Sequence, residues 1–252
     1  MRPNPYDNPH EQYGHLTGAE GFLLRWLEDK GYDYDLFSDE DLHDDDQLLY
    51  AYKAFIIHTH PEYWTKEMYN HLYRYLQRGG NFMYLGGNGV YWKVVIDKHQ
   101  NVLEVRKEGE THKYEATQGG QWRNLDLPEQ ALLGVAYDAR GYGTEKPYVV
   151  KSEGHPFFKG MNLKNGDLFG TQCVNRDGAS GLETDKIGTH SPRLTLLARG
   201  NNPDDGGADM VTYEHPGGGT VFSVGSVSYT SALPVDSNIS RLTQNVLNHM
   251  LK

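Results

Sequence analysis

The sequence predicts an α/β fold in which a parallel sheet is flanked by helices and carries an antiparallel β-rich insertion. Two observations favour the sheet: apolar runs at Ala54–Thr59 and Asn81–Leu85, and a helical pattern between them. A strand, a helix and a strand joined by tight loops form a βαβ unit. A third observation, short alternating segments after Tyr91, predicts the insertion. The 252 residues are 37% hydrophobic and 12% aromatic, which is enough apolar material for one large core.

The N-terminal part of the chain is expected to be an arm followed by a helix. Residues 1–16 are polar and rich in proline, without periodicity, and are interpreted as the arm. Thr17 and Glu20 have the spacing of a capping box, so a helix should begin there and end at Gly31. The alternating segment Tyr32–Phe37 then predicts a short strand.

The βαβ unit follows. Ala54–Thr59 (AFIIHT) is expected to be a buried strand, and Thr65 is expected to cap the next helix. Gly79 and Gly80 should end that helix before the strand Asn81–Leu85.

The remainder of the chain is predicted to complete one α/β domain over residues 17–252. Val102–Lys107 and His112–Ala116 alternate as strands do and mark an inserted β-rich segment at about 93–148. Three later segments are expected to return to the sheet, and a last helix should begin near Asn238. Those three segments are Leu194–Ala198, Met210–Tyr213 and Thr220–Val224.

Composition narrows the function classes. A formal net charge of -10, with no basic stripe, argues against nucleic acid as a partner. Apolar runs fall short of the roughly 20 residues that a bilayer requires, so we expect no membrane association. Cys173 is the only cysteine, which favours a reducing, cytoplasmic location and a role as a small buried hydrophobe.

Polar residues follow both strands of the βαβ unit. His60-Pro61-Glu62 comes after the first strand, and Gly86-Gly87-Asn88-Gly89 after the second. The carboxyl ends of neighbouring parallel strands meet at one edge, where ligands bind in open α/β sheets. His60, Glu62 and Asn88 should therefore converge. An imidazole and a carboxylate held in a rigid turn suit either a divalent metal or an acid/base pair.

Simpler explanations exist for each of these residues. Glu62 could cap the helix near Thr65, with His60 packed against it. Glu183, in a glycine-rich loop, could supply a second carboxylate or be a solvated acid. Gly87, Tyr91 and Trp92 are expected to line a substrate pocket. The chain has no Gly-x-Ser-x-Gly elbow, so a serine hydrolase is excluded.

Six stretches, in order over about residues 31–250, resemble the C-terminal domain of the N,N-dimethylformamidase large subunit. The most specific are THPEYW (Thr59–Trp64) and GGNFMYLGGNGVYWKV (Gly79–Val94). GYDYDLFSDEDLH (31–43), GLETD (181–185), DMVTYEHPGGGTVFSVGSVS (209–228) and NISRLTQNVL (238–247) support them. The resemblance implies a flavodoxin-like fold of the class I glutamine amidotransferase type.

The resemblance also implies a chemistry: hydrolysis of small N-substituted formamides at a mononuclear iron held by two tyrosines and a glutamate. By motif, Glu62 would be the iron ligand and Glu183 a general base, with His60 and Asn88 beside the substrate. The two tyrosine ligands are expected upstream of the first helix, where this sequence has only Tyr6 and Tyr13, and neither stands in a matching segment. The iron centre could therefore be completed by another chain, either a small subunit or a second copy.

Two functions remain open. The first is an iron-dependent amidohydrolase acting on a small amide. The second is a non-catalytic amidotransferase-like domain that binds a small polar ligand or a partner subunit. A glutamine amidotransferase is disfavoured, because no nucleophilic cysteine stands at the glycine-rich turn.

Overall fold

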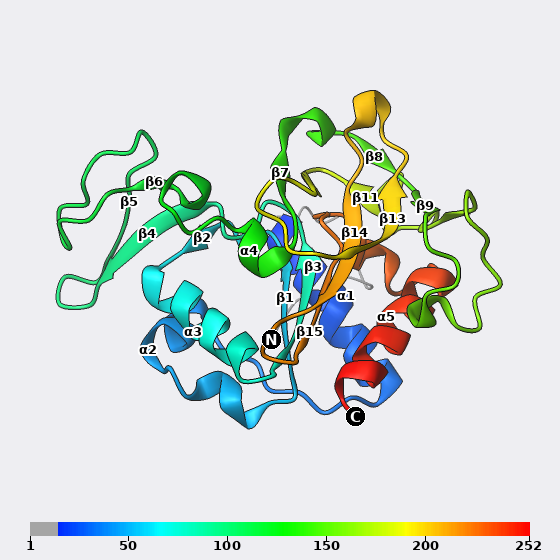
Figure 1. The fold of residues 1–252 in the computed structure, drawn as a ribbon, viewed down its shortest axis with the longest axis horizontal. Coiled ribbons are helices and arrows are strands. Elements are labelled where there is room, and N and C mark those ends of the chain that lie inside the picture. The colour runs from blue at the N-terminus through cyan, green and yellow to red at the C-terminus, as the bar shows by residue number, and fades with distance from the viewer. Residues whose placement is uncertain (1–14) are drawn as a thin grey trace.

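The computed structural model describes residues 15–252. In this part of the chain the main sheet has seven strands, shown from the side in Figure 1. Their order is β1 (Ala54–Thr59), β3 (Asn81–Gly86), β15 (Thr220–Ser223), β14 (Asp209–Glu214), β13 (Thr195–Gly200), β9 (Tyr148–Val150) and β10 (Leu168–Phe169).

The sheet is mixed, not parallel throughout. Strands β1, β3 and β15 are parallel to one another. Each of β14, β13, β9 and β10 is antiparallel to its neighbour. The predicted parallel sheet is therefore correct for three strands and wrong for the rest, because the connection from β14 to β15 is a short turn, which joins antiparallel strands.

Helices cover both faces of the sheet. Helices α2 (Asp39–Asp44) and α3 (Lys66–Gln77) lie on one side, and α1 (His15–Lys30) and α5 (Ser237–Met250) on the other (Figure 1). Alternate residues of β3 face the two layers: Phe82 and Tyr84 pack in the core with α3, and Met83 and Leu85 pack with α1 and α5. This explains why β3 reads as a continuous apolar run.

The predicted helices are present, with one shifted start. Helix α3 begins as expected, since the Thr65 hydroxyl accepts a hydrogen bond from the backbone N–H of Met68. Helix α1 already includes His15, so Thr17 lies inside the helix and is not its N-cap. The rest of the predicted arm, residues 1–14, lies outside the described residues. No helix within residues 15–252 combines the length and the apolar character needed to cross a lipid bilayer.

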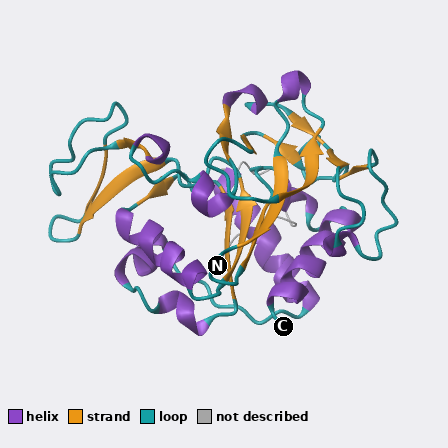
Figure 2. Cartoon of the chain, viewed as in Figure 1, coloured by secondary structure: helices purple, strands orange, loops and turns teal. Residues whose placement is uncertain are grey.

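The insertion forms a separate small sheet that projects from the helical layers (Figure 2). It consists of β2 (Tyr63–Trp64), β4 (Trp92–Asp97), β5 (Val102–Val105) and β6 (Gly120–Gln121). The pair of β4 with β5 is antiparallel, as predicted. The predicted strand at His112–Ala116 is wrong, because this segment folds into a turn closed by the Ala116 N–H and the His112 carbonyl.

Shorter elements complete the chain. They are the helix α4 (Gln130–Leu133) and the strands β7 (Ala136–Asp138), β8 (Glu145–Lys146), β11 (Ser180–Gly181) and β12 (Thr184–Lys186). Six short 3-10 turns are also described: Leu48–Ala51, Trp122–Asn124, Ala139–Gly141, Pro156–Phe158, Pro203–Asp205 and Tyr229–Ala232.

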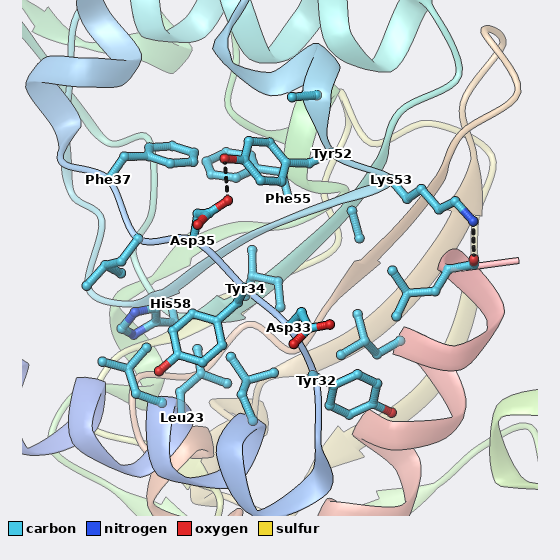
Figure 3. Close-up of a pocket in the computed structure, with 18 residues that line it drawn as sticks. Leu23, Tyr32, Asp33, Tyr34, Asp35, Phe37, Tyr52, Lys53, Phe55 and His58 are labelled. Carbon is cyan, nitrogen blue, oxygen red and sulfur yellow. Dashed lines mark hydrogen bonds between the residues drawn. The ribbon is translucent and has the colours of Figure 1, made fainter.

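The predicted strand Tyr32–Phe37 is extended backbone that pairs with no strand. It runs beside β1, the edge strand of the main sheet, and leaves a cavity of about 300 Å³ between itself, β1 and α1 (Figure 3). The Tyr52 hydroxyl donates to an Asp35 carboxylate oxygen at 2.9 Å and so fixes one end of the segment. The alternating residues of Tyr32–Phe37 therefore predicted a segment that runs beside the sheet, but the predicted strand does not form, because the segment pairs with no other strand.

Candidate functional site

The two loops predicted to converge are joined by backbone hydrogen bonds. The Gly87 N–H donates to the Thr59 carbonyl at 3.0 Å, and the Val90 N–H to the Pro61 carbonyl at 2.8 Å. The Trp92 N–H then donates to the Glu62 carbonyl at 2.9 Å, where β2 and β4 pair in parallel. These bonds extend the parallel pairing of β1 and β3 past the ends of both strands.

A third loop reaches the same place from β12. The Glu183 carbonyl accepts the Val227 N–H at 3.3 Å, and a Cβ atom on Gly87 would stand 2.5 Å from that carbonyl oxygen. Gly87, predicted to line a pocket, is buried between the Glu183 loop and Val227. Its lack of a side chain lets these segments approach each other.

We therefore expect Gly87→Ala to lower the free energy of unfolding by about 1–3 kcal/mol, because the added methyl overlaps backbone atoms that cannot move aside alone. Urea denaturation would measure the change. The control is Gly18→Ala in α1, where an added Cβ meets nothing within 4 Å. That change should stabilise the protein by about 0.5–1 kcal/mol. Equal effects of the two substitutions would contradict the close packing at Gly87.

His60 is the centre of the side-chain cluster. Its Nε2 atom lies 3.4 Å from a Glu183 carboxylate oxygen, 3.8 Å from a Glu62 oxygen and 3.4 Å from the Asn88 amide nitrogen. The side chains of His60, Glu62 and Glu183 are 14%, 17% and 19% exposed, so both carboxylates are partly shielded from water. Glu183 is thus not a solvated loop acid, and Thr65, not Glu62, caps α3.

The charges in the cluster affect the imidazole. Burial lowers the pKa of His60, but the hydrogen bond with Glu183 and the negative charges of Glu183, Glu62 and Asp185 outweigh burial and raise it. The two nearest carboxylates thus stabilise the protonated form of the imidazole relative to an isolated histidine.

Asn88 is buried in an unusual conformation. Its φ of +52° lies in the left-handed region, and its side-chain Oδ1 has no hydrogen-bond partner among the described residues. The two β-branched residues with positive φ in the described chain, Thr59 (+63°) and Val90 (+52°), stand in the same pair of loops. Such strain is costly and concentrates at ligand-binding sites. The unpartnered amide oxygen is available to a ligand.

Sequence reasoning missed the buried residues beneath the cluster. Asp185 is fully buried and accepts the Asn88 backbone N–H at 2.8 Å. Its other oxygen accepts the Tyr84 hydroxyl at 2.7 Å. Tyr137 pairs with Asp185 across β7 and β12, and burial, aided by the Glu183 charge, raises its pKa to about 12. A lone aspartate two residues after Glu183 carries no spacing pattern that would reveal this role.

The predicted pocket aromatics flank the cluster. Tyr91 and Trp92 are half-buried and meet edge to face, with ring centroids 4.8 Å apart. The Arg123 guanidinium lies 5.2 Å from the Tyr91 ring centre, and Lys107 Nζ 5.2 Å from the Trp92 ring centre. Tyr91 is near enough to Glu62 and Glu183 for their charges to contribute to its raised pKa, after the larger effect of burial.

The cavity shown in Figure 3 is separate from the cluster formed by His60, Glu62, Asn88 and Glu183. Its lining includes His58 but none of the four cluster residues. A groove of about 250 Å³ along β1 connects the region of His58 to His60 and Pro61.

Residues 1–244 match the model of a protein family described as "N,N-dimethylformamidase beta subunit-like, C-terminal". The chain belongs to this family. Two N,N-dimethylformamidase beta subunits, from Alcaligenes sp and Paracoccus aminophilus, are each 30% identical to it. The alignments, with their gaps, extend over 282 and 286 residues. Each comparison covers 93% of this chain and 37% of the relative, so the chain spans well under half of the relatives' length.

Solved structures resemble the fold at low sequence identity. A β-galactosidase from Bacillus circulans sp. alkalophilus has a TM-score of 0.54 and 14% identity, covering 96% of this chain and 28% of the enzyme. A ThuA-like protein from Bacteroides uniformis has a TM-score of 0.54 and 15% identity, covering 96% and 87%. These similarities concern the fold alone.

The family resemblance implies an iron ion held by Glu62 and two tyrosines. Within residues 15–252, no three side chains among His, Cys, Asp and Glu are placed to hold one metal ion together. Glu62 is the predicted ligand, and its carboxylate faces His60. The cluster by itself offers two carboxylates, an imidazole and an amide, which are groups for proton transfer and for hydrogen bonding to a carbonyl.

Proposed function

We propose that this domain hydrolyses small N-substituted formamides as part of an N,N-dimethylformamidase-like enzyme. One observation carries the proposal: His60 Nε2 lies within 3.4–3.8 Å of polar atoms of Glu183, Glu62 and Asn88, which come from three separate loops. Family membership adds the substrate class, because the related proteins are named N,N-dimethylformamidase beta subunits.

The proposed steps use the residues of the chain. A water molecule attacks the formyl carbon while the Glu183 carboxylate takes its proton. The carbonyl oxygen becomes an oxyanion, to which the side-chain NH₂ group of Asn88 and an imidazole N–H of His60 donate hydrogen bonds. Glu183 returns the proton to the amide nitrogen as the C–N bond breaks, which releases formate and the amine. Glu62, whose carboxylate lies 3.8 Å from the same His60 Nε2 atom, helps to hold the imidazole in place.

Two finer expectations belong to this proposal. A glutamine amidotransferase-like ancestry is supported by the parallel β1, β3 and β15 segment with its site at the carboxyl ends of the strands. A partner subunit is supported by the names of the relatives, which are subunits themselves. Iron is implied by the resemblance alone, with Glu62 as the ligand that the motif assigns.

Amine release from N,N-dimethylformamide tests the hydrolase. We expect the purified chain, supplied with Fe²⁺, to release dimethylamine and formate in equal amounts, measured by NMR. The alternative, a non-catalytic domain, predicts no release and a thermal stabilisation by N,N-dimethylformamide that survives Glu62→Ala. Stabilisation without turnover would favour the binding domain and reject hydrolysis by this chain.

A further inference from the structure

The backbone of the GGNG turn is left-handed at Asn88 (φ +52°) and at Val90 (φ +52°), and the second of these is costly for a β-branched residue, so contacts must hold the turn. Two buried hydrogen bonds act on adjacent amides of the loop. The Asn88 N–H donates to Asp185 Oδ1 at 2.8 Å, and the Gly89 N–H donates to the Tyr84 hydroxyl at 2.7 Å. The same Tyr84 hydroxyl donates to Asp185 Oδ2 at 2.7 Å, so both bonds lead to one carboxyl group.

Asp185 is itself held rigidly. Its side chain and that of Tyr84 are fully buried, and its own N–H donates to the Gly225 carbonyl at 2.8 Å. Strand β12, which contains Asp185, pairs with β7 and begins directly after Glu183. Strand β12 thus fixes the position of Glu183, which directly precedes it. Through Asp185 it also fixes the backbone of Asn88.

We propose that Asp185 is a positioning residue of the formamide-hydrolysing site, which fixes the main chain of Asn88 so that the Asn88 amide faces His60 and the substrate oxygen. Tyr84 assists by linking the same carboxyl group to Gly89. The expected loss of kcat rests on the proposed function. The expected loosening of the Asn88 backbone does not.

A double-mutant cycle tests the kinetic consequence. Asp185→Ala should lower kcat for amine release from N,N-dimethylformamide by about 10–100-fold, as the loss of supporting hydrogen bonds typically does, with a smaller change in KM. In an Asn88→Ala background the amide is already missing, so adding Asp185→Ala should change kcat by no more than about twofold. An equal loss in both backgrounds would show that Asp185 acts through the fold in general and would overturn the proposal.

Amide hydrogen exchange tests the structural consequence without any substrate. Asp185→Ala should speed exchange at Asn88 and Gly89, and Tyr84→Phe at Gly89 alone. Asp185→Asn should keep Asn88 protected, because its Oδ1 can still accept the N–H. If the alanine variant does not fold, Tyr84→Phe, which removes the bond from the Gly89 N–H, takes its place. Unchanged exchange in Asp185→Ala would reject the positioning role. Faster exchange in a chain without turnover would support it and reject the proposed function instead.

Discussion

Replacing Glu183 with glutamine is expected to lower kcat for amine release from N,N-dimethylformamide by about 10²–10⁴-fold, the usual contribution of a general base. Glutamine has nearly the same shape and can still contact His60, but it cannot take a proton from water. KM should change little, because the substrate oxygen is held by other groups. Initial rates over a range of substrate concentrations would separate kcat from KM.

Glu145→Gln is the matched control for this experiment. Glu145 is also a partly buried carboxylate, with 15% of its side chain exposed, and it is ion-paired with Arg176 at 3.1 Å. It belongs to β8, which pairs with β11 just before the Glu183 loop, and its carboxylate oxygens bind Arg176 and the Asp177 N–H. We expect its kcat to remain unchanged. If Glu183→Gln were as active as Glu145→Gln, Glu183 would not be the base.

The stability of the protein is expected to fall as the pH rises from about 4 to about 7, because of Asp185. Burial raises the pKa of this carboxyl from 3.8 to about 7, although the hydrogen bonds from Tyr84 and Asn88 act in the opposite direction. Of the more distant charges, Glu129 raises the pKa and Arg123 lowers it. Between these pH values the unfolded chain has released the Asp185 proton and the folded chain retains it, so each rise in pH favours unfolding.

The expected size of this effect is on the order of 4 kcal/mol, at about 1.4 kcal/mol per pH unit. The stabilisation that protonated Asp185 gives the folded state is fully present below about pH 4 and is lost above about pH 7. Urea unfolding of the wild type and of Asp185→Asn, measured at several pH values, isolates it from other groups. The difference in unfolding free energy between the two proteins should change across this interval. A constant difference would show that Asp185 titrates normally.

Local patterns predicted the parallel part of the fold and the meeting of its loops. The strand at Ala54–Thr59, the Thr65 cap and the glycine stop at Gly79 each depend on neighbouring residues, and the structure has all three. From these, the convergence of His60, Glu62 and Asn88 followed by the geometry of a βαβ unit, without knowledge of the chemistry. The distances around His60 confirm that convergence.

The rest depended on contacts between distant parts of the chain. Asp185 lies 97 residues from the Asn88 N–H that it accepts, and no local spacing relates them. The antiparallel direction of β14 likewise could not be predicted, because five of its six residues are buried, as in a parallel strand covered on both faces. Tyr32–Phe37 alternates as a strand does, yet it lies beside the sheet edge without joining it.

The projecting small sheet sets a practical limit on how the insertion can be shortened by protein engineering. The backbone N–H of Trp92, the first residue of β4, donates to the Glu62 carbonyl at 2.9 Å, and the Tyr91 N–H donates to the same oxygen at 3.0 Å. A hairpin truncated beyond Val94 would retain these hydrogen bonds and leave the His60–Glu62 turn intact. A deletion that begins at Tyr91 would instead remove both donors to the Glu62 carbonyl and release the turn that carries Glu62.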